Sequence, residues 1–156
     1  RVAIGAYFND GNGSNSGHVR IYEWAGTSWV QLGQDLDGES GSDFSGWSVS
    51  INDSGDRVAV GAPNNDGNGV DAGHVRVYEW GGVSWVQLGL DIDGEAAGDQ
   101  SGYSVSINAA GDARAKSLAV HYTCVFILFY YFVNFFHDFF CFALGSTNSE
   151  NFWFLW

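Results

Sequence analysis

Acidic residues recur in two short loops at a spacing that could hold a calcium ion. Asp35, Asp37, Glu39 and Asp43 occupy positions 1, 3, 5 and 9 of the first loop, and Asp91, Asp93, Glu95 and Asp99 repeat this spacing in the second. Carboxylate oxygens are the ligands that calcium prefers, and a glycine inside each loop permits a sharp turn. Neither loop has a distal bidentate glutamate. The sequence therefore suggests calcium as a cofactor at these eight residues, with a solvated acidic loop as the alternative.

Other residues with possible chemistry fit structural roles better. His18 and His74 stand at the same repeat position, which favours a structural role over catalysis, because a catalytic residue is rarely reproduced in every repeat. The Asn-Asp-Gly stretches at 9–13 and 65–69 supply oxygens but are above all turn formers. The sequence holds no nucleophile elbow, phosphate-binding loop, dinucleotide fingerprint or zinc pair. We therefore expect the chain not to be an enzyme.

Four tryptophans also recur with the repeat, namely Trp24, Trp29, Trp80 and Trp85. Their recurrence favours packing between repeats. The alternative is a platform on which sugars stack, because an aromatic ring combines a broad apolar face with a polar edge.

Residues 1–56 and 57–112 are two copies of one sequence, with 38 of 56 aligned positions identical. A fixed period of this length indicates a stacked array, because a single unit cannot bury its own apolar faces. Apolar residues alternate with polar or small ones in short runs between turn-forming residues, which predicts β-strands. Eight strands are expected: 1–7, 18–24, 28–34, 46–52, 57–63, 74–80, 84–90 and 102–108.

Four short antiparallel strands per unit is the plan of a β-propeller blade. The fold class predicted from the sequence is therefore all-β, with about two four-stranded antiparallel blades in residues 1–112. A propeller closes with about 4 to 8 blades, so this propeller is incomplete and further blades of the same protein are expected.

The sequence resembles the FG-GAP repeat family at Gly61-Ala62-Pro63, which follows the opening Gly46-Trp47-Ser48-Val49-Ser50. The resemblance covers residues 1–112 and implies the β-propeller found in integrin alpha subunits and in many microbial surface proteins. Ser45-Gly46 replaces the family's Phe-Gly pair, and the family's calcium loop is reduced to the short turn 52–56. Calcium binding is therefore not expected at that turn, because calcium takes 6–8 oxygen ligands.

The acidic charge of the two repeats excludes some classes of binding partner. The two repeats hold 16 acidic residues against 4 arginines, and the whole chain has a formal net charge of −12. Nucleic acid and anionic membranes need a basic patch, so neither is expected as a partner of the repeats. We expect a non-enzymatic extracellular or cell-surface interaction module, serving adhesion or the binding of a protein or glycan. The alternatives are an accessory propeller of a larger secreted enzyme and a purely structural repeat.

The repeat stops at Asp112, and residues 113–156 differ in composition. From 117 to 149 there is no Lys, Arg, Glu, Gln, Met, Trp or Pro, and the run is rich in phenylalanine. Three interpretations stay open: translated non-coding sequence, a membrane segment at 118–144, or a native packed element. A hydrophobic helix is expected in each case, and a membrane is a partner only if 118–144 is a genuine anchor. Both cysteines lie in this tail, so no disulfide framework is visible.

Overall fold

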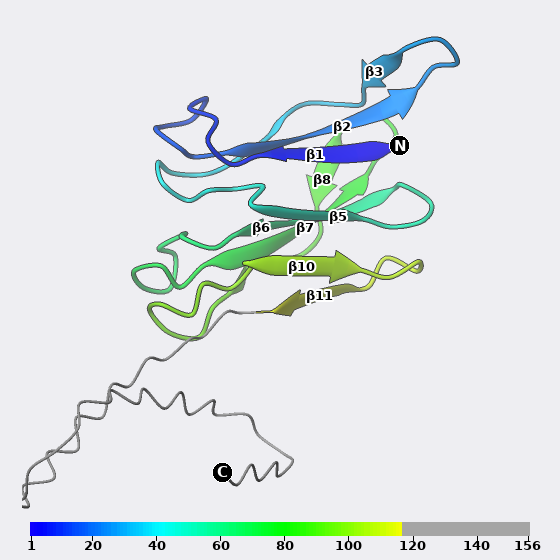
Figure 1. Cartoon of the computed structure of the whole chain (residues 1–156). Helices are drawn as coiled ribbons and strands as arrows, with labels where there is room; N and C mark the ends of the chain where they lie inside the picture. The colour runs from blue at the N-terminus through cyan, green and yellow to red at the C-terminus, as the bar shows by residue number, and fades with distance from the viewer. Residues whose placement is uncertain (117–156) are drawn as a thin grey trace, which may run out of the picture. The chain divides into compact units, whose positions relative to one another are not determined.

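The computed structural model describes residues 1–116, which form antiparallel β-sheets and no helix (Figure 1). The first sheet contains β1 (Val2–Ala6), β2 (His18–Trp24), β3 (Trp29–Gln31) and β4 (Leu36–Asp37). The second contains β5 (Ser48–Ile51), β6 (Arg57–Ala62), β7 (His74–Trp80), β8 (Trp85–Gln87) and β9 (Ile92–Asp93). The third contains β10 (Ser104–Ile107) and β11 (Ala113–Lys116). The all-β prediction is confirmed for these residues.

The second sheet has the order β5-β6-β7-β8, and β9 pairs with the other half of β7. β8 and β9 together therefore act as one interrupted fourth strand, and β3 and β4 do the same beside β2. The expectation of one continuous strand over 84–90 and over 28–34 was wrong. Gly33 and Gly89 lie at the interruptions with φ near +80°, a conformation that breaks an extended strand.

The core lies between the first and second sheets. Because side chains alternate along a strand, β2 directs Val19 and Ile21 to one face, and both are fully buried. Val58 and Val60 of β6 meet them from the second sheet. Apolar alternation in two neighbouring copies of the repeat thus produces one shared core.

Glycines allow the backbones of neighbouring sheets to approach closely. A side chain on Gly5 of β1 would lie 2.1 Å from the carbonyl oxygen of Gly46, which precedes β5. A side chain on Gly61 of β6 would lie 2.0 Å from the carbonyl oxygen of Gly102, which precedes β10. The same contact therefore recurs with the 56-residue period, and only glycine fits it.

The strand β11 lies directly after Asp112, where the repeat stops. Val105 of β10 pairs with Ala115, whereas its counterpart Val49 pairs with Val60, so the register of β11 is displaced by one residue. The predicted tail helix and the predicted membrane segment at 118–144 lie outside the described residues. Within residues 1–116 there is no helix that could span a bilayer.

Candidate functional site

Two loops of each repeat meet at one end of the sheets, on the left in Figure 1. In the first repeat the loop between β1 and β2 is hydrogen-bonded along its length to the acidic loop after β4. The backbone N–H of Gly38 donates to the Gly17 carbonyl at 2.9 Å, Ser42 donates to Ser14 at 2.7 Å, and Ser45 donates to Ser16 at 2.9 Å. These bonds hold the two loops as one interlocked pair.

The second repeat builds the same interlock from the loop between β6 and β7 and the loop after β9. Gly94 donates to the Gly73 carbonyl at 2.8 Å, and Ser101 donates to the Ala72 carbonyl at 2.8 Å. The Asn68 amide adds a bond of 2.8 Å to the Gly94 carbonyl. Both loop pairs therefore present their side chains from an ordered backbone.

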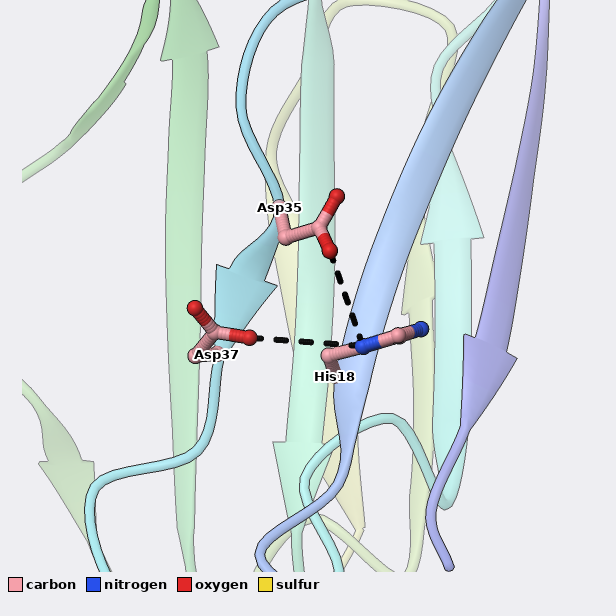
Figure 2. A group of neighbouring side chains, drawn as sticks. All are labelled: His18, Asp35 and Asp37. Carbon is pink, nitrogen blue, oxygen red and sulfur yellow. Dashed lines mark ion pairs between the residues drawn. The ribbon is translucent and has the colours of Figure 1, made fainter. Parts of the chain in front are cut away.

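The first loop pair brings one histidine together with two of the predicted metal ligands. Figure 2 shows Nδ1 of His18, at the start of β2, facing carboxylate oxygens of Asp35 and Asp37. Nδ1 lies 3.8 Å from the Asp35 oxygen and 4.0 Å from the Asp37 oxygen. The ligating atoms of the three residues all lie within 4.8 Å of one another, a set that could hold a divalent cation.

An arginine already balances the charge of Asp35. The guanidinium of Arg20 donates two hydrogen bonds to this carboxylate, at 2.9 and 2.7 Å. These bonds, with a further one from the Gln31 amide, lower the pKa of Asp35 to about 2. A metal ion at this group would therefore compete with a guanidinium.

The second group joins the two repeats. Glu39 of the first repeat lies with His74 and Asp91 of the second, again with ligating atoms within 4.8 Å. Arg76 of β7 forms ion pairs with both Glu39 and Asp91. This arginine therefore links neighbouring repeats through a carboxylate from each.

His74 is the buried member of that second group, with 3% of its surface exposed. Its Nδ1 has no hydrogen-bond partner among residues 1–116, and the nearest Asp91 oxygen is 3.8 Å away. Burial and the positive charge of Arg76 lower the pKa of His74, so the imidazole is neutral at neutral pH.

The remaining predicted ligands are not members of these two groups, although Asp43 shares the Asn65 amide with Glu39. Asp43 is buried and accepts hydrogen bonds from the Ser40 N–H and the Asn65 amide, at 2.9 and 3.0 Å. Asp99 accepts a bond from the Ala96 N–H at 2.8 Å. Asp93 and Glu95 are exposed. The structure thus divides the predicted carboxylates among different partners, and calcium binding stays a prediction.

A partly exposed aromatic cluster lies beside the acidic loop of the first repeat; Phe8, Trp47 and Tyr103 are exposed, and the other two rings are half-buried. It consists of Tyr7, Phe8, Phe44, Trp47 and Tyr103. Ring centroids are 4.3 Å apart for Tyr7 and Phe8, 4.9 Å for Tyr7 and Trp47, and 5.3 Å for Trp47 and Tyr103. Phe8 is 63% exposed. Contiguous exposed aromatic surface is uncommon except at binding sites.

Sequence reasoning missed this aromatic cluster because three of its five rings are not reproduced in the second copy of the repeat. The counterparts of Tyr7, Phe8 and Phe44 in the second repeat are Pro63, Asn64 and Gln100. The cluster could have been found from the positions at which the two copies of the repeat differ. The arginine pairs were also missed, although Arg20 with Asp35 and Arg76 with Asp91 recur at the same separation in both copies.

The family model described as FG-GAP repeat matches residues 35–78. The resemblance inferred from the sequence is therefore confirmed over that segment, which runs from the first acidic loop into β7. No curated protein matches the chain in a sequence comparison.

Proposed function

We propose that the chain is a non-enzymatic interaction module, built on FG-GAP-like β-propeller blades, that binds a protein or glycan at its loop end. The family match at 35–78 and the sheet order β5-β6-β7-β8 support the blade architecture. In this architecture the second sheet is one complete blade, and the first and third sheets are parts of its neighbours. Further blades of the same protein would complete the propeller.

The observation that carries this proposal is the aromatic cluster at the interlocked loops. The second repeat folds into the same strands with Asn64 and Gln100 where the first has Phe8 and Phe44. These aromatic side chains are therefore not needed to build a sheet of this kind. Aromatic residues contribute much of the binding energy in protein interfaces, and sugars also stack on their flat faces.

The acidic loops beside the cluster add charge to the same end of the sheets. They favour a ligand that is neutral, basic or bridged by a cation over an anionic one. The resemblance to surface-protein repeats supports an extracellular or cell-surface location for such a module. Calcium belongs to this proposal as a cofactor of the acidic loops.

The experiment compares two variants whose new residues come from the chain itself. In the first, Phe8→Asn with Phe44→Gln gives the first repeat the residues of the second. In the control, Val83→Thr gives an exposed turn of the second repeat the residue of the first, and Val83 is 86% exposed. Labelled protein is applied to an array of glycans and to an array of purified extracellular protein domains.

We expect the unmodified chain and the Val83→Thr control to bind the same array members. We expect the double variant to lose this binding while keeping its circular dichroism spectrum. Absence of binding on both arrays, or equal binding by the double variant, contradicts the proposal. Cleavage of an arrayed glycan or protein would favour the alternative of a propeller in a secreted enzyme.

A further inference from the structure

The group formed by Glu39, His74 and Asp91 contains a buried nitrogen that the described protein leaves unpaired. We call these three residues the interface group, because Glu39 comes from the first repeat and the other two from the second. His74 is buried, and its Nδ1 has no hydrogen-bond partner among residues 1–116. Buried polar atoms are nearly always paired, so an unpaired one requires an explanation. A neutral imidazole nitrogen is a common metal ligand, and carboxylates surround this one.

The separations within the interface group suit a zinc ion. Nδ1 of His74 lies 3.8 Å from Oδ2 of Asp91, which is too far for a hydrogen bond. Two atoms that bind zinc at about 2.1 Å in a tetrahedral arrangement are about 3.4 Å apart. The ligating atom of Glu39 lies within 4.8 Å of both other ligating atoms. Small side-chain rotations would therefore place all three atoms around one ion.

The strands of the second sheet bring the interface group together. His74 is the first residue of β7, and β9 pairs with β7 at this residue. This pairing brings Asp91, which directly precedes β9, beside His74. Glu39 reaches the same place from the acidic loop of the first repeat. An ion bound here would therefore join the two repeats.

The charge around the interface group favours a divalent cation. The Asn65 amide donates to Asp43 at 3.0 Å and to Glu39 at 3.5 Å, so a third carboxylate lies beside Glu39 and Asp91. Arg76 forms ion pairs with Glu39 and Asp91 and supplies one positive charge. Three carboxylates and one guanidinium leave two negative charges in excess. A divalent ion would balance this excess.

Arg76 can keep its place when the ion binds. Its Nε donates to Oδ1 of Asp91 at 2.8 Å, and its Nη2 donates to Oδ2 at 2.7 Å. A carboxylate oxygen has two lone pairs, so Oδ2 can bind a metal while it accepts this hydrogen bond. Hydrogen bonds to a ligating carboxylate orient it toward the metal. Arg76 would therefore act as a positioning residue.

We propose that the interface group binds one zinc ion through Nδ1 of His74, Oδ2 of Asp91 and a carboxylate oxygen of Glu39, and that this ion ties the two repeats together. Water takes the fourth position of the tetrahedron. The nitrogen ligand favours zinc over calcium, because calcium takes oxygen ligands. Glu39 and Asp91 also belong to the predicted calcium loops, so the test includes calcium. The site does not depend on a ligand of the aromatic cluster.

The group formed by His18, Asp35 and Asp37 is the alternative location for the ion. All three residues come from the first repeat, so an ion here would join no repeats. Two carboxylates and the guanidinium of Arg20 leave one negative charge in excess, which is less than at the interface group. The test must therefore separate the two groups.

The experiment titrates the full 156-residue chain with zinc chloride in a calorimeter. All proteins carry Cys124→Ser and Cys141→Ser, because thiols also bind zinc. Cobalt(II) then replaces zinc as a spectroscopic probe, because its visible absorption is much stronger in a tetrahedral site than in an octahedral one. A final titration repeats the zinc measurement in excess calcium chloride.

Four variants locate the ion. Glu39→Gln and His74→Gln each remove one proposed ligand. Glu95→Gln is the matched control, because it makes the same change at the equivalent position of the second repeat and belongs to neither group. His18→Gln tests the alternative location. Circular dichroism confirms folding, and Glu39→Gln, whose side chain is 48% exposed, decides the test if His74→Gln does not fold.

We expect the reference protein, Glu95→Gln and His18→Gln to bind zinc alike and to give strong cobalt absorption. Glu39→Gln should bind zinc at least about 10-fold more weakly, because loss of even an outer partner of a metal ligand costs about 10–100-fold in affinity. Excess calcium should not displace the zinc. Absence of zinc binding, equal affinity of Glu39→Gln and Glu95→Gln, loss of binding in His18→Gln alone, or displacement by calcium would overturn the proposal.

Discussion

Replacing one tryptophan in each repeat measures how strongly the two sheets stabilise each other. Trp85→Ala and Trp29→Ala delete the same side chain at equivalent positions of the second and first sheets. The quantity compared is the change in the free energy of unfolding.

The difference in exposure sets the expected magnitude. A tryptophan buries about 150–250 Å², and Trp85 is 3% exposed against 53% for Trp29. Trp85 therefore buries about 100 Å² more, which is worth about 2.5 kcal/mol at about 25 cal/mol per Å². Its hydrogen bond to the Leu32 carbonyl adds about 1 kcal/mol. Trp85→Ala should thus cost about 3–4 kcal/mol more than Trp29→Ala.

Urea denaturation followed by circular dichroism supplies both values, provided that each variant unfolds in one cooperative step. Circular dichroism is the signal of choice because tryptophan fluorescence is itself altered by the substitutions. Equal costs for the two substitutions, or a larger cost for Trp29→Ala, would refute the packing of the second sheet against the first.

Three further predictions follow from glycine packing, ion pairs and the acidic loops. Gly61→Ala should lower the melting temperature strongly, because the new methyl group would meet the Gly102 carbonyl oxygen at 2.0 Å. The control Gly81→Ala introduces the residue that the first repeat has at position 25, and it should change the melting temperature little. The pKa of Asp35 is lowered to about 2 in the folded chain, so its stabilising contribution is complete above about pH 4 and is lost as the pH falls toward 2; Asp35→Asn should flatten the pH dependence of unfolding in that window. Calcium at millimolar concentration should raise the melting temperature. Asp93→Ala should remove this gain, whereas the control Asp53→Ala, in the short turn 52–56, should keep it. A melting temperature that calcium leaves unchanged contradicts the calcium proposal.

The sequence predicted the strands correctly where apolar alternation and turn-forming residues mark the same strand ends. β2 and β7 begin and end at the predicted residues, because each is a seven-residue run between a glycine and a turn. The split of the fourth strand was not predictable from alternation, because it depends on the positive φ adopted by Gly33 and Gly89.

The candidate site was harder to predict from the sequence, because its contacts join residues that are far apart in the chain. Spacing within one loop grouped Asp35 with Glu39, but folding places Glu39 with Arg76 and His74 of the next repeat. Spacing cannot show which arginine balances which carboxylate, since that depends on how the sheets stack. The aromatic cluster combines residues that follow β1 with residues that precede β5 and β10, and repeat comparison hides it because the second copy lacks three of its rings.

Interlocked loops at the acidic end are the structural basis of the proposed interaction module, and hydrogen–deuterium exchange measures them directly. The amides of Gly38, Ser42 and Ser45 in the first repeat, and of Gly94 and Ser101 in the second, donate to the facing loop. They should exchange as slowly as the amides of β2 and β7, because opening a loop requires several of these bonds to break together. Exchange at the rate of an unstructured peptide in both loops would contradict a preformed binding surface.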